Sequence, residues 1–257
     1  MKYYVTADVH GFYTEFHNAL ESAGYFSDPE PHRLVLLGDM FDRGEEAVKM
    51  QDFVLSLLEQ EVLILIRGNH EDLFEELVTT DEGVPYRHHV LNGTYRTALQ
   101  LTAYDPLAAR RRNLTFAAKA RETPFFQRIL PAAVDYYETE KHVFVHGWIP
   151  CIREQDGGST YDPEWRSAGE AAWRAARWMN GMDAVQTCRE EGKMILCGHW
   201  HCSYGHAVYE GRGSEFGPDA DFSPYEAPGI LALDACTAFS GRVNVAVIED
   251  KELPKIG

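Results

Sequence analysis

Residues 34–44 read LVLLGDMFDRG, an apolar run that ends in a loop holding two carboxylates and a guanidinium. The run has the composition expected of a strand that is buried on both faces of a parallel sheet. Asp39 therefore emerges at the carboxyl end of a strand, which is where open α/β sheets bind ligands. Because a bare carboxylate in that position requires a cation, we expect a cation site there.

Four other apolar runs are also followed directly by polar side chains that can bind a metal. The runs cover residues 3–7, 62–66, 143–145 and 194–197, and the side chains that follow them are Asp8, His10, Asn69, His70, His146, His199 and His201. Five predicted strand ends thus present Asp, Asn or His. We expect them to converge at one edge of the fold.

The spacing of apolar residues predicts how these strands are connected. Residues 12–23 and 47–58 have helical spacing, so the chain begins as a βαβαβ unit with parallel strands and right-handed crossovers. Helical patterning broken by prolines fills residues 73–130, which we interpret as an inserted helical cap. Strand-like segments then return. We predict a single domain over residues 1–257, with two sheets and helices outside them.

Composition and cysteine usage indicate a globular, unexported protein. The chain has 257 residues, 45% of them apolar and 25% charged. No apolar run approaches the ~18 residues of a membrane span, and no leader is evident, so we expect a cytoplasmic protein without membrane contact. The five cysteines are odd in number and irregularly spaced, which argues against a disulfide framework and favours a reducing compartment. They are Cys151, Cys188, Cys197, Cys202 and Cys236.

The charge of the chain limits its partners. A formal net charge of -16 repels polyanions, so extended nucleic acid is a poor partner. Residues 84–130 are an exception, because eight Lys or Arg against two acidic residues make this segment +6 and leave -22 for the remainder. A solvated helix face is the simpler interpretation, above all for Arg110, Arg111 and Arg112. The alternative is a basic cap over an anionic substrate.

The candidate ligands suggest the kind of metal and the number of ions. Carboxylate, amide and imidazole donors suit Mn, Fe, Zn or Ni. Seven candidates exceed what one ion usually takes from protein, whereas two ions sharing a carboxylate fit the count, as in hydrolases of phosphate esters. We choose Asp39 as the shared ligand. A separate Cys2His2 zinc site around His199 is disfavoured, because the adjacent residues His201 and Cys202 would point apart.

Five motifs, taken in order, resemble those of a known family. They are Asp8-x-His10, Gly38-Asp39-x-x-Asp42-Arg43-Gly44, Arg67-Gly68-Asn69-His70-Glu71, His146-Gly147 and Gly198-His199-x-His201. This series resembles the calcineurin-like metallophosphoesterases. The second and third motifs are most similar to the phosphoprotein phosphatase branch and its bacterial relatives, which include symmetrical dinucleoside tetraphosphatases. The resemblance implies a four-layer α/β/β/α sandwich, with the cap at about residues 73–130.

The resemblance also implies roles for the metal ligands. One ion would be held by Asp8, His10 and His201, the other by Asn69, His146 and His199, and both by Asp39. Mn or Fe would be favoured over Zn or Ni. Singly, each of these histidines is better explained as a hydrogen-bonded core residue, but jointly they favour the metal site.

For catalysis, the resemblance implies that His70 is the general acid, Asp42 its orienting partner and Arg43 a clamp on phosphate oxygens. Relatives use a second phosphate-binding arginine, for which Arg177 is our candidate. Asp42 and Arg43 could otherwise form only a surface ion pair, but they adjoin a predicted ligand.

Several tryptophans bear on access to the predicted site. Trp148 follows His146-Gly147, and Trp200 separates the two last histidines; both are larger than is usual in the family and are expected to narrow the site. The set Trp165, Trp173 and Trp178 is spaced as a packing face more than as a base-stacking platform.

These observations predict a hydrolase of phosphoesters. The preferred substrate is a phosphomonoester on a protein or a small molecule, such as a nucleotide. The alternative is symmetrical hydrolysis of dinucleoside polyphosphates. A non-catalytic metal-bound scaffold is the interpretation from another class, and His70, Asp42 and Arg43 count against it because scaffolding needs none of them.

Overall fold

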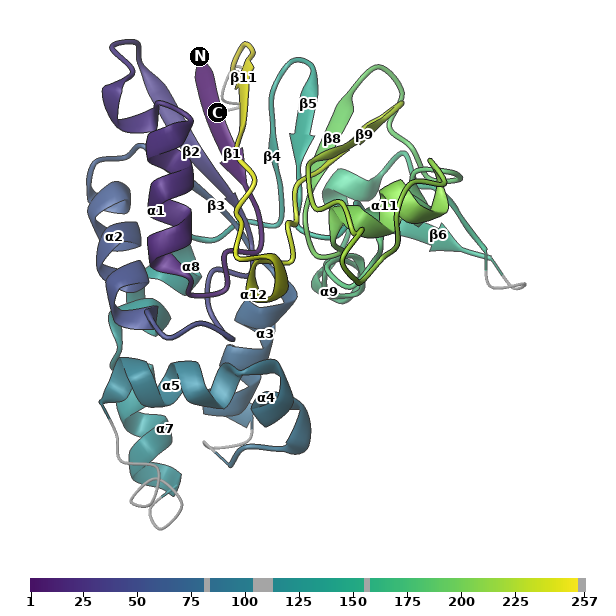
Figure 1. The fold of residues 1–257 in the computed structure, drawn as a ribbon. Coiled ribbons are helices and arrows are strands. Elements are labelled where there is room, and N and C mark those ends of the chain that lie inside the picture. Colours follow the sequence, from purple (N-terminus) through teal and green to yellow (C-terminus); the bar gives the residue numbers. More distant parts are fainter. Residues whose placement is uncertain (81–83, 104–112, 155–157, 254–257) are drawn as a thin grey trace.

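The computed structural model describes residues 1–80, 84–103, 113–154 and 158–253. Its first sheet has four strands in the order β11-β1-β2-β3 (Figure 1). The strands are β1 (Lys2–Thr6), β2 (His32–Leu37), β3 (Leu63–Ile66) and β11 (Ala246–Glu249), and the helices between the first three are α1 (Tyr13–Ser22) and α2 (Ala47–Glu59). β1, β2 and β3 are parallel, and β11 pairs antiparallel with β1 at the edge. The predicted βαβαβ unit is therefore confirmed.

The second sheet has five strands in the order β4-β5-β8-β10-β9. They are β4 (Tyr137–Glu138), β5 (His142–Phe144), β8 (Met194–Cys197), β9 (Tyr225–Ala227) and β10 (Ile230–Ala232). β5, β8 and β10 are parallel neighbours, with β4 and β9 antiparallel at the two edges. A separate antiparallel pair is formed by β6 (Cys151–Arg153) and β7 (Ser159–Tyr161).

Alternate side chains of each central strand enter different layers, which explains the continuous apolar runs. In β1, Tyr4 packs with the core around α1 and α2, whereas Tyr3 and Val5 pack between the two sheets against Phe144 of β5 and Leu196 of β8. The opposite faces of β5 and β8 pack against the helices that follow them. The order is helices, sheet, sheet, helices, so the predicted four-layer sandwich is confirmed.

Short helices surround the second sheet. They are α9 (Glu170–Ala176), α10 (Gly181–Ala184), α11 (Cys202–Val208) and α12 (Thr237–Ser240). α9 and α10 contribute Trp173 and Met182 to the core of that sheet. α12 lies near the carboxyl end of β1, between the two halves of the molecule (Figure 1).

The segment predicted as a cap contains mainly helices in its described residues. They are α3 (Asn69–Glu75), α4 (Arg87–Asn92), α5 (Thr94–Thr102), α7 (Asn113–Arg121) and α8 (Leu130–Ala132), with π-helical turns at Glu76–Thr80 and Phe125–Ile129. α4, α5 and α7 lie beyond the carboxyl ends of the first sheet (Figure 1). Phe74, Ala98 and Phe116 belong to the same core as α1 and α2. The helices of this segment thus share a core with α1 and α2, and a single domain with an inserted cap at about 73–130 stays a prediction.

The basic residues of the cap are largely engaged by neighbours. Arg128 pairs with Glu59 at 2.9 Å, and Arg96 contacts Glu45. Arg121 donates to the carbonyl of Val78. Arg110, Arg111 and Arg112 lie outside the described residues.

The structure corrects the prediction made for the cysteines. Cys151 in β6 and Cys188 after α10 form a disulfide, although 37 positions separate them in the sequence. Cys197, Cys202 and Cys236 are free thiols. The fold brings two irregularly spaced residues together, which spacing alone did not reveal. A reducing compartment is no longer supported by the cysteines, and the cytoplasmic location stays a prediction.

Among the helices of the described residues, none combines the length and apolar character needed to cross a membrane.

Candidate metal centre

The loops after the strands adopt a strained backbone where the predicted ligands lie. Nine described non-glycine residues have positive φ, and seven of them belong to these loops. The seven are Asp8, His10, Asp39, Asp42, Arg43, His199 and Cys236. Such conformations cost about 1–3 kcal/mol each and persist only where the surroundings impose them. Their clustering at one edge of the sheets marks this edge as a functional site.

Glu71 fixes the two central loops against each other. Its carboxylate accepts hydrogen bonds from the backbone N–H groups of Gly68, Asp39 and Met40, at 2.8, 2.9 and 3.1 Å. The N–H of His70 in turn donates to Oδ1 of Asp39 at 3.0 Å. The last residue of the Arg-Gly-Asn-His-Glu motif thus acts as a buried brace between the loops after β2 and β3, and this brace holds the Asp39 carboxylate in place.

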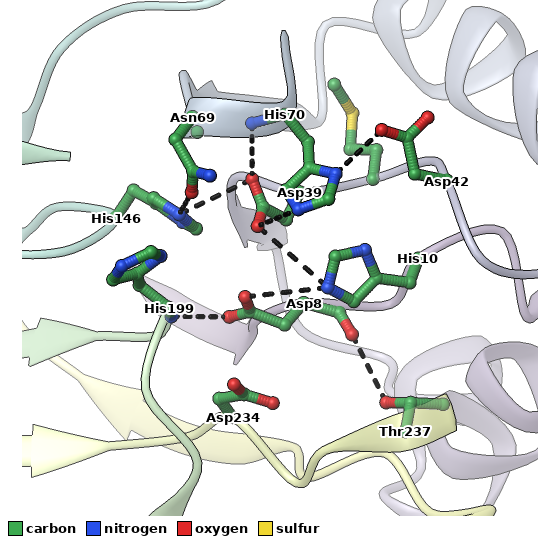
Figure 2. A network of polar contacts seen from close by, with 12 residues as sticks. Asp8, His10, Asp39, Asp42, Asn69, His70, His146, His199, Asp234 and Thr237 are labelled. Carbon is green, nitrogen blue, oxygen red and sulfur yellow. Dashed lines mark hydrogen bonds and ion pairs between the residues drawn. The ribbon is translucent and has the colours of Figure 1, made fainter. Parts of the chain in front are cut away.

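The side chains of Asn69, His146 and His199 lie on the side of Asp39 that carries Oδ1 (Figure 2). Nδ1 of His146 donates to the carbonyl of Leu37 at 2.7 Å, so its Nε2 carries the lone pair when the ring is neutral. That Nε2 lies 2.8 Å from Oδ1 of Asn69 and 3.4 Å from Oδ1 of Asp39. A neutral His146 ring thus places its lone pair close to two oxygen acceptors, an arrangement that favours a cation between them. His199 also belongs to this group of mutually close ligand atoms.

A second set faces the other oxygen of Asp39. His10 donates from Nδ1 to the carbonyl of Phe41 at 2.9 Å, which directs Nε2 inward. This Nε2 lies 3.9 Å from Oδ2 of Asp39 and 4.0 Å from Oδ1 of Asp8. Asp39 therefore presents one oxygen to each set, as a shared ligand would. The donor atoms present fit two ions of the predicted kind.

Burial shapes the protonation of these ligands. It lowers the pKa of His10 and His146, and it lowers that of His199 to about 3. Burial, reinforced by the charges of Asp234 and Asp39, raises the pKa of Asp8. Neutral imidazoles are the form that binds metal. Crowded carboxylates gain stability from a cation, so both effects favour metal binding.

His201 lies at the pocket wall with its Nε2 directed to Oε1 of Glu215, at 2.9 Å. Its ring stacks on Trp200 and tilts against Phe216. His201 is absent from both groups of close ligand atoms around Asp39. The structure thus gives Nε2 of His201 a carboxylate partner, and the role of His201 as a metal ligand stays a prediction.

His70 and Asp42 form a buried pair next to the ligands. Nδ1 of His70 lies 2.6 Å from Oδ2 of Asp42, and the hydroxyl of Thr94 donates to the same oxygen at 2.7 Å. Nε2 of His70 faces Oδ2 of Asp39 at 3.8 Å. Burial alone would lower the pKa of His70, but the Asp39 charge and the Asp42 hydrogen bond outweigh it and raise the pKa to about 9. In the metal-free protein these two carboxylates therefore favour the protonated imidazole.

Arg43 and Arg177 have different surroundings. Arg43 is exposed and lines the pocket beside His70. Arg177 is buried, and its guanidinium pairs with Glu170, Asp135 and Asp72, at 3.0, 3.3 and 3.4 Å. Of the described arginines, only Arg43 lines the pocket. The structure thus commits Arg177 to three carboxylates, whereas the sequence predicted that it binds phosphate.

Asp234 is a site residue that the sequence did not single out. It follows β10, is 6% exposed and lines the pocket, with Oδ1 accepting from the N–H of Cys236 at 2.7 Å. Burial chiefly raises its pKa to about 6. Three residues later, the hydroxyl of Thr237 donates to the carbonyl of Asp8 (Figure 2). The signal that could have identified Asp234 is the one used for the other ligands, namely an apolar strand followed directly by a carboxylate.

These side chains line a cavity of about 120 Å³. The lining residues are His10, Asp39, Arg43, Asn69, His70, Asn92, Trp178, His199, His201, Asp234, Cys236, Thr237 and Ala238. Trp148 is buried with its indole N–H donating to the carbonyl of Cys188, and neither it nor Trp200 is a lining residue. The prediction that both narrow the entrance is therefore wrong, because they pack behind the ligands.

A four-layer sandwich with carboxylates and imidazoles crowded at the ends of its strands is the arrangement of the metal-dependent phosphoesterases. A profile of the calcineurin-like phosphoesterases matches residues 1–203, so the chain belongs to this family. The prediction made from the motifs is thus confirmed.

Matches to individual proteins of known name cover only short segments of the chain. The chain is 36% identical over 72 residues to the asymmetrical bis(5'-nucleosyl)-tetraphosphatase PrpE of Geobacillus thermodenitrificans, covering 26% of this chain and 29% of that protein. It is 34% identical over 84 residues to the symmetrical bis(5'-nucleosyl)-tetraphosphatase of Glaesserella parasuis, covering 33% and 28%. The chain thus spans less than a third of the length of these relatives.

A solved structure assigned provisionally as a diadenosine tetraphosphatase shares the fold. It is 14% identical to this chain, with a TM-score of 0.52 over 96% of this chain and 89% of the other. Identity at this level supports the shared architecture alone.

Proposed function

We propose that this protein hydrolyses phosphomonoesters, on a small molecule or a protein, with a dinuclear metal centre. The observation that carries the proposal is the convergence of His146 Nε2, Asn69 Oδ1 and Asp39 Oδ1 on one point. Nε2 of His70 faces the other oxygen of the same Asp39 at 3.8 Å. Metal ligands next to a proton donor are what phosphoester hydrolysis requires.

Two sets of residues would hold the ions. Asp8 and His10 would bind one, Asn69, His146 and His199 the other, and Asp39 both, with Mn or Fe favoured. The ions would supply positive charge for the phosphoryl oxygens and would activate a water molecule as the nucleophile. The ring orientations are fixed by the Nδ1 hydrogen bonds of His10 and His146 to backbone carbonyls, as is usual for ligating histidines.

The other groups act on the substrate directly. His70 would give its Nε2 proton to the leaving oxygen while Asp42 keeps the ring oriented through Nδ1. Arg43 would bind phosphoryl oxygens, because it is the arginine at the pocket among the described residues. A scaffold that only bound metal would need neither group, so the pair of His70 and Asp42 favours an enzyme.

Dinucleoside polyphosphates are the second candidate. The relatives from Geobacillus thermodenitrificans and Glaesserella parasuis carry the name tetraphosphatase. The same groups would serve a phosphoanhydride, since the leaving group is again an oxygen. The shared segments are short, so we keep the phosphomonoester as the first substrate class.

The test is a substrate panel assayed with chelated protein to which Mn²⁺ is returned. Glycerol phosphate, a phosphoserine peptide, diadenosine tetraphosphate and duplex DNA are compared by kcat/KM at one salt concentration, with protein lacking added metal as the control. We expect metal-dependent release of phosphate from the monoesters and no cleavage of DNA. A clear preference for the tetraphosphate would establish the second candidate. If no compound is turned over, the proposal of an enzyme fails, and a non-catalytic scaffold that binds metal becomes the better interpretation.

A further inference from the structure

Trp178 has an exposed indole at the rim of the metal pocket. It lines the cavity and is 50% exposed, while its ring lies 5.7 Å from that of His199 at 84°. The sequence predicted that Trp165, Trp173 and Trp178 form one packing face, which is correct for the first two because both are buried. It is wrong for Trp178, whose side chain leaves that core.

The backbone fixes Trp178 firmly relative to the ligands. The N–H of Trp148 donates to the carbonyl of Ala176 at 3.1 Å. A Cβ on Gly147 would lie 2.5 Å from that same oxygen, so the end of α9 packs directly on the backbone after His146. His199 is also hydrogen-bonded to the backbone of Trp178. The backbone of Trp178 is therefore held beside the loops that carry His146 and His199, and its indole contacts His199.

No other large aromatic side chain shares this position in the described part of the chain. Phe216 and Phe239 are also exposed and lie 6.1 Å apart, but neither lines the cavity. Among the described lining residues, Trp178 is the one Trp, Tyr or Phe. A flat group of the substrate can therefore be recognised by stacking at this one residue.

The size and layout of the pocket determine where that flat group is attached. A volume of about 120 Å³ has room for a phosphoryl group but not for a bicyclic ring as well. The leaving oxygen belongs at His70, whereas Trp178 contacts His199, and Figure 2 shows His199 away from the His70–Asp42 pair. A ring bonded directly to the leaving oxygen, as in phosphotyrosine, would lie near His70. A ring on Trp178 must be connected through several more atoms.

We propose that Trp178 stacks on the nucleobase of a nucleoside phosphate, whose phosphoryl group lies in the metal pocket. A nucleoside places a ribose between its phosphate and its aromatic ring, which gives the separation that the layout demands. The inference rests on the proposed function, because it takes the same pocket as the phosphoryl site. It names nucleotides as the substrate class.

The first test compares two ligands that differ only in the base. Adenosine 5'-monophosphate and ribose 5-phosphate are titrated calorimetrically into Mn²⁺-loaded protein carrying His70→Asn, in which turnover is slowed. We expect the nucleotide to bind about tenfold more tightly, in line with the effect of one stacked base. Equal affinities would overturn the inference, and this result needs no substitution of Trp178.

The second test uses variants in the otherwise native enzyme. Trp178→Ala should lower the ratio of kcat/KM for adenosine 5'-monophosphate to that for ribose 5-phosphate about tenfold, mainly through KM. Trp178→Phe should keep most of the preference. Phe26→Ala is the matched control, because Phe26 is 48% exposed and lies outside the metal pocket. Equal losses for both substrates would show a structural role and overturn the proposal.

The outcomes separate this inference from the proposed function. Turnover of monoesters without a preference for the nucleotide would leave the function standing and remove the base site. If the nucleotide binds more tightly but no substrate is turned over, the base site stands and the proposed hydrolase function fails. A preference of wild-type enzyme for a phosphotyrosine peptide over adenosine 5'-monophosphate would overturn the assignment to nucleotides.

Discussion

Asp39 lies between the two sets of candidate ligands, with Oδ1 toward His146 and Oδ2 toward His10. Its backbone N–H is held by Glu71, and Oδ1 accepts from the N–H of His70. A single carboxylate thus organises metal ligands and proton donor together. Substitutions at this residue and at His70 should have different signatures, because only one of the two side chains is assigned to metal.

We predict that Asp39→Asn loses bound metal and activity together. An amide oxygen is a poor bridge between two cations. The substitution also removes the negative charge that faces His10 and His146. Metal content per chain, measured by elemental analysis after reloading with Mn²⁺, is the test. Asp52→Asn, on the exposed side of α2, is the control and should keep both ions. Two ions per chain and near-normal turnover in Asp39→Asn would contradict the assignment.

His70→Asn should keep its metal but lose proton delivery. We expect kcat to fall on the order of 10²–10⁴ for a poor leaving group such as glycerol, and far less for nitrophenolate, which leaves without a proton. Measuring both substrates with metal-loaded enzyme separates these effects. Equal losses for the two leaving groups would refute the role of general acid.

The raised pKa of His70 also predicts a pH dependence for metal-free protein. Its folded pKa of about 9 exceeds the ordinary value of about 6.5, so the charged form is favoured by folding. Its contribution to stability is complete below about pH 6.5 and is lost as pH rises through 9. The difference in unfolding free energy between chelated wild type and His70→Gln should shrink over this range. A difference that stays constant from pH 6 to 9.5 would show that the pair is not charged.

At the scale of elements, the ligands depend on how closely the loop after β8 approaches the loop after β1. The N–H of His199 donates to Oδ2 of Asp8 at 2.8 Å, which joins the two sheets at the site. Gly198 makes this contact feasible, because a Cβ there would overlap the same oxygen of Asp8. A side chain at this position must displace a candidate ligand.

We therefore predict that Gly198→Ala weakens metal binding at least tenfold and lowers the melting temperature. Gly169→Ala is the matched control, since nothing lies within 4 Å of a Cβ at Gly169. Calorimetric titration of Mn²⁺ into the two chelated variants provides the comparison. Unchanged affinity in Gly198→Ala would show that the Asp8 carboxylate does not bind the ion.

At the scale of the whole molecule, the site joins residues that are far apart in the chain. Asp8 and Asp39 come from the first sheet, whereas His146, His199 and Asp234 come from the second. Buried carboxylates and imidazoles crowd together where the sheets meet. This arrangement is unfavourable without a cation, so the stability of the protein should depend on metal.

Chelation should therefore lower the melting temperature, and returning Mn²⁺ should restore it in proportion to the logarithm of its concentration. Scanning calorimetry of the protein with and without chelator measures the shift, and Asp39→Asn should show little of it. If the melting temperature stayed constant after confirmed removal of metal, the cluster would not be a metal site.

The sequence alone determined the sandwich, the order of its first strands and the side chains that meet at their ends. A strand buried on both faces requires a continuous apolar run, and a ligand at its end must follow that run directly, so both signals are local. The segments 34–44 and 62–71 carry both signals. These features were predictable because they depend on neighbours in the chain.

Only the tertiary structure decided which partner each remaining side chain meets. Cys151 bonds Cys188, Arg177 pairs with three carboxylates and His201 turns to Glu215, although each had another expected role. Asp234 follows a strand of three residues, and only the packing of the two sheets brings its carboxylate close to Asp8. Trp178 is exposed at the pocket while neighbours at similar spacing are buried. Such outcomes depend on how distant elements pack, and spacing along the chain does not encode them.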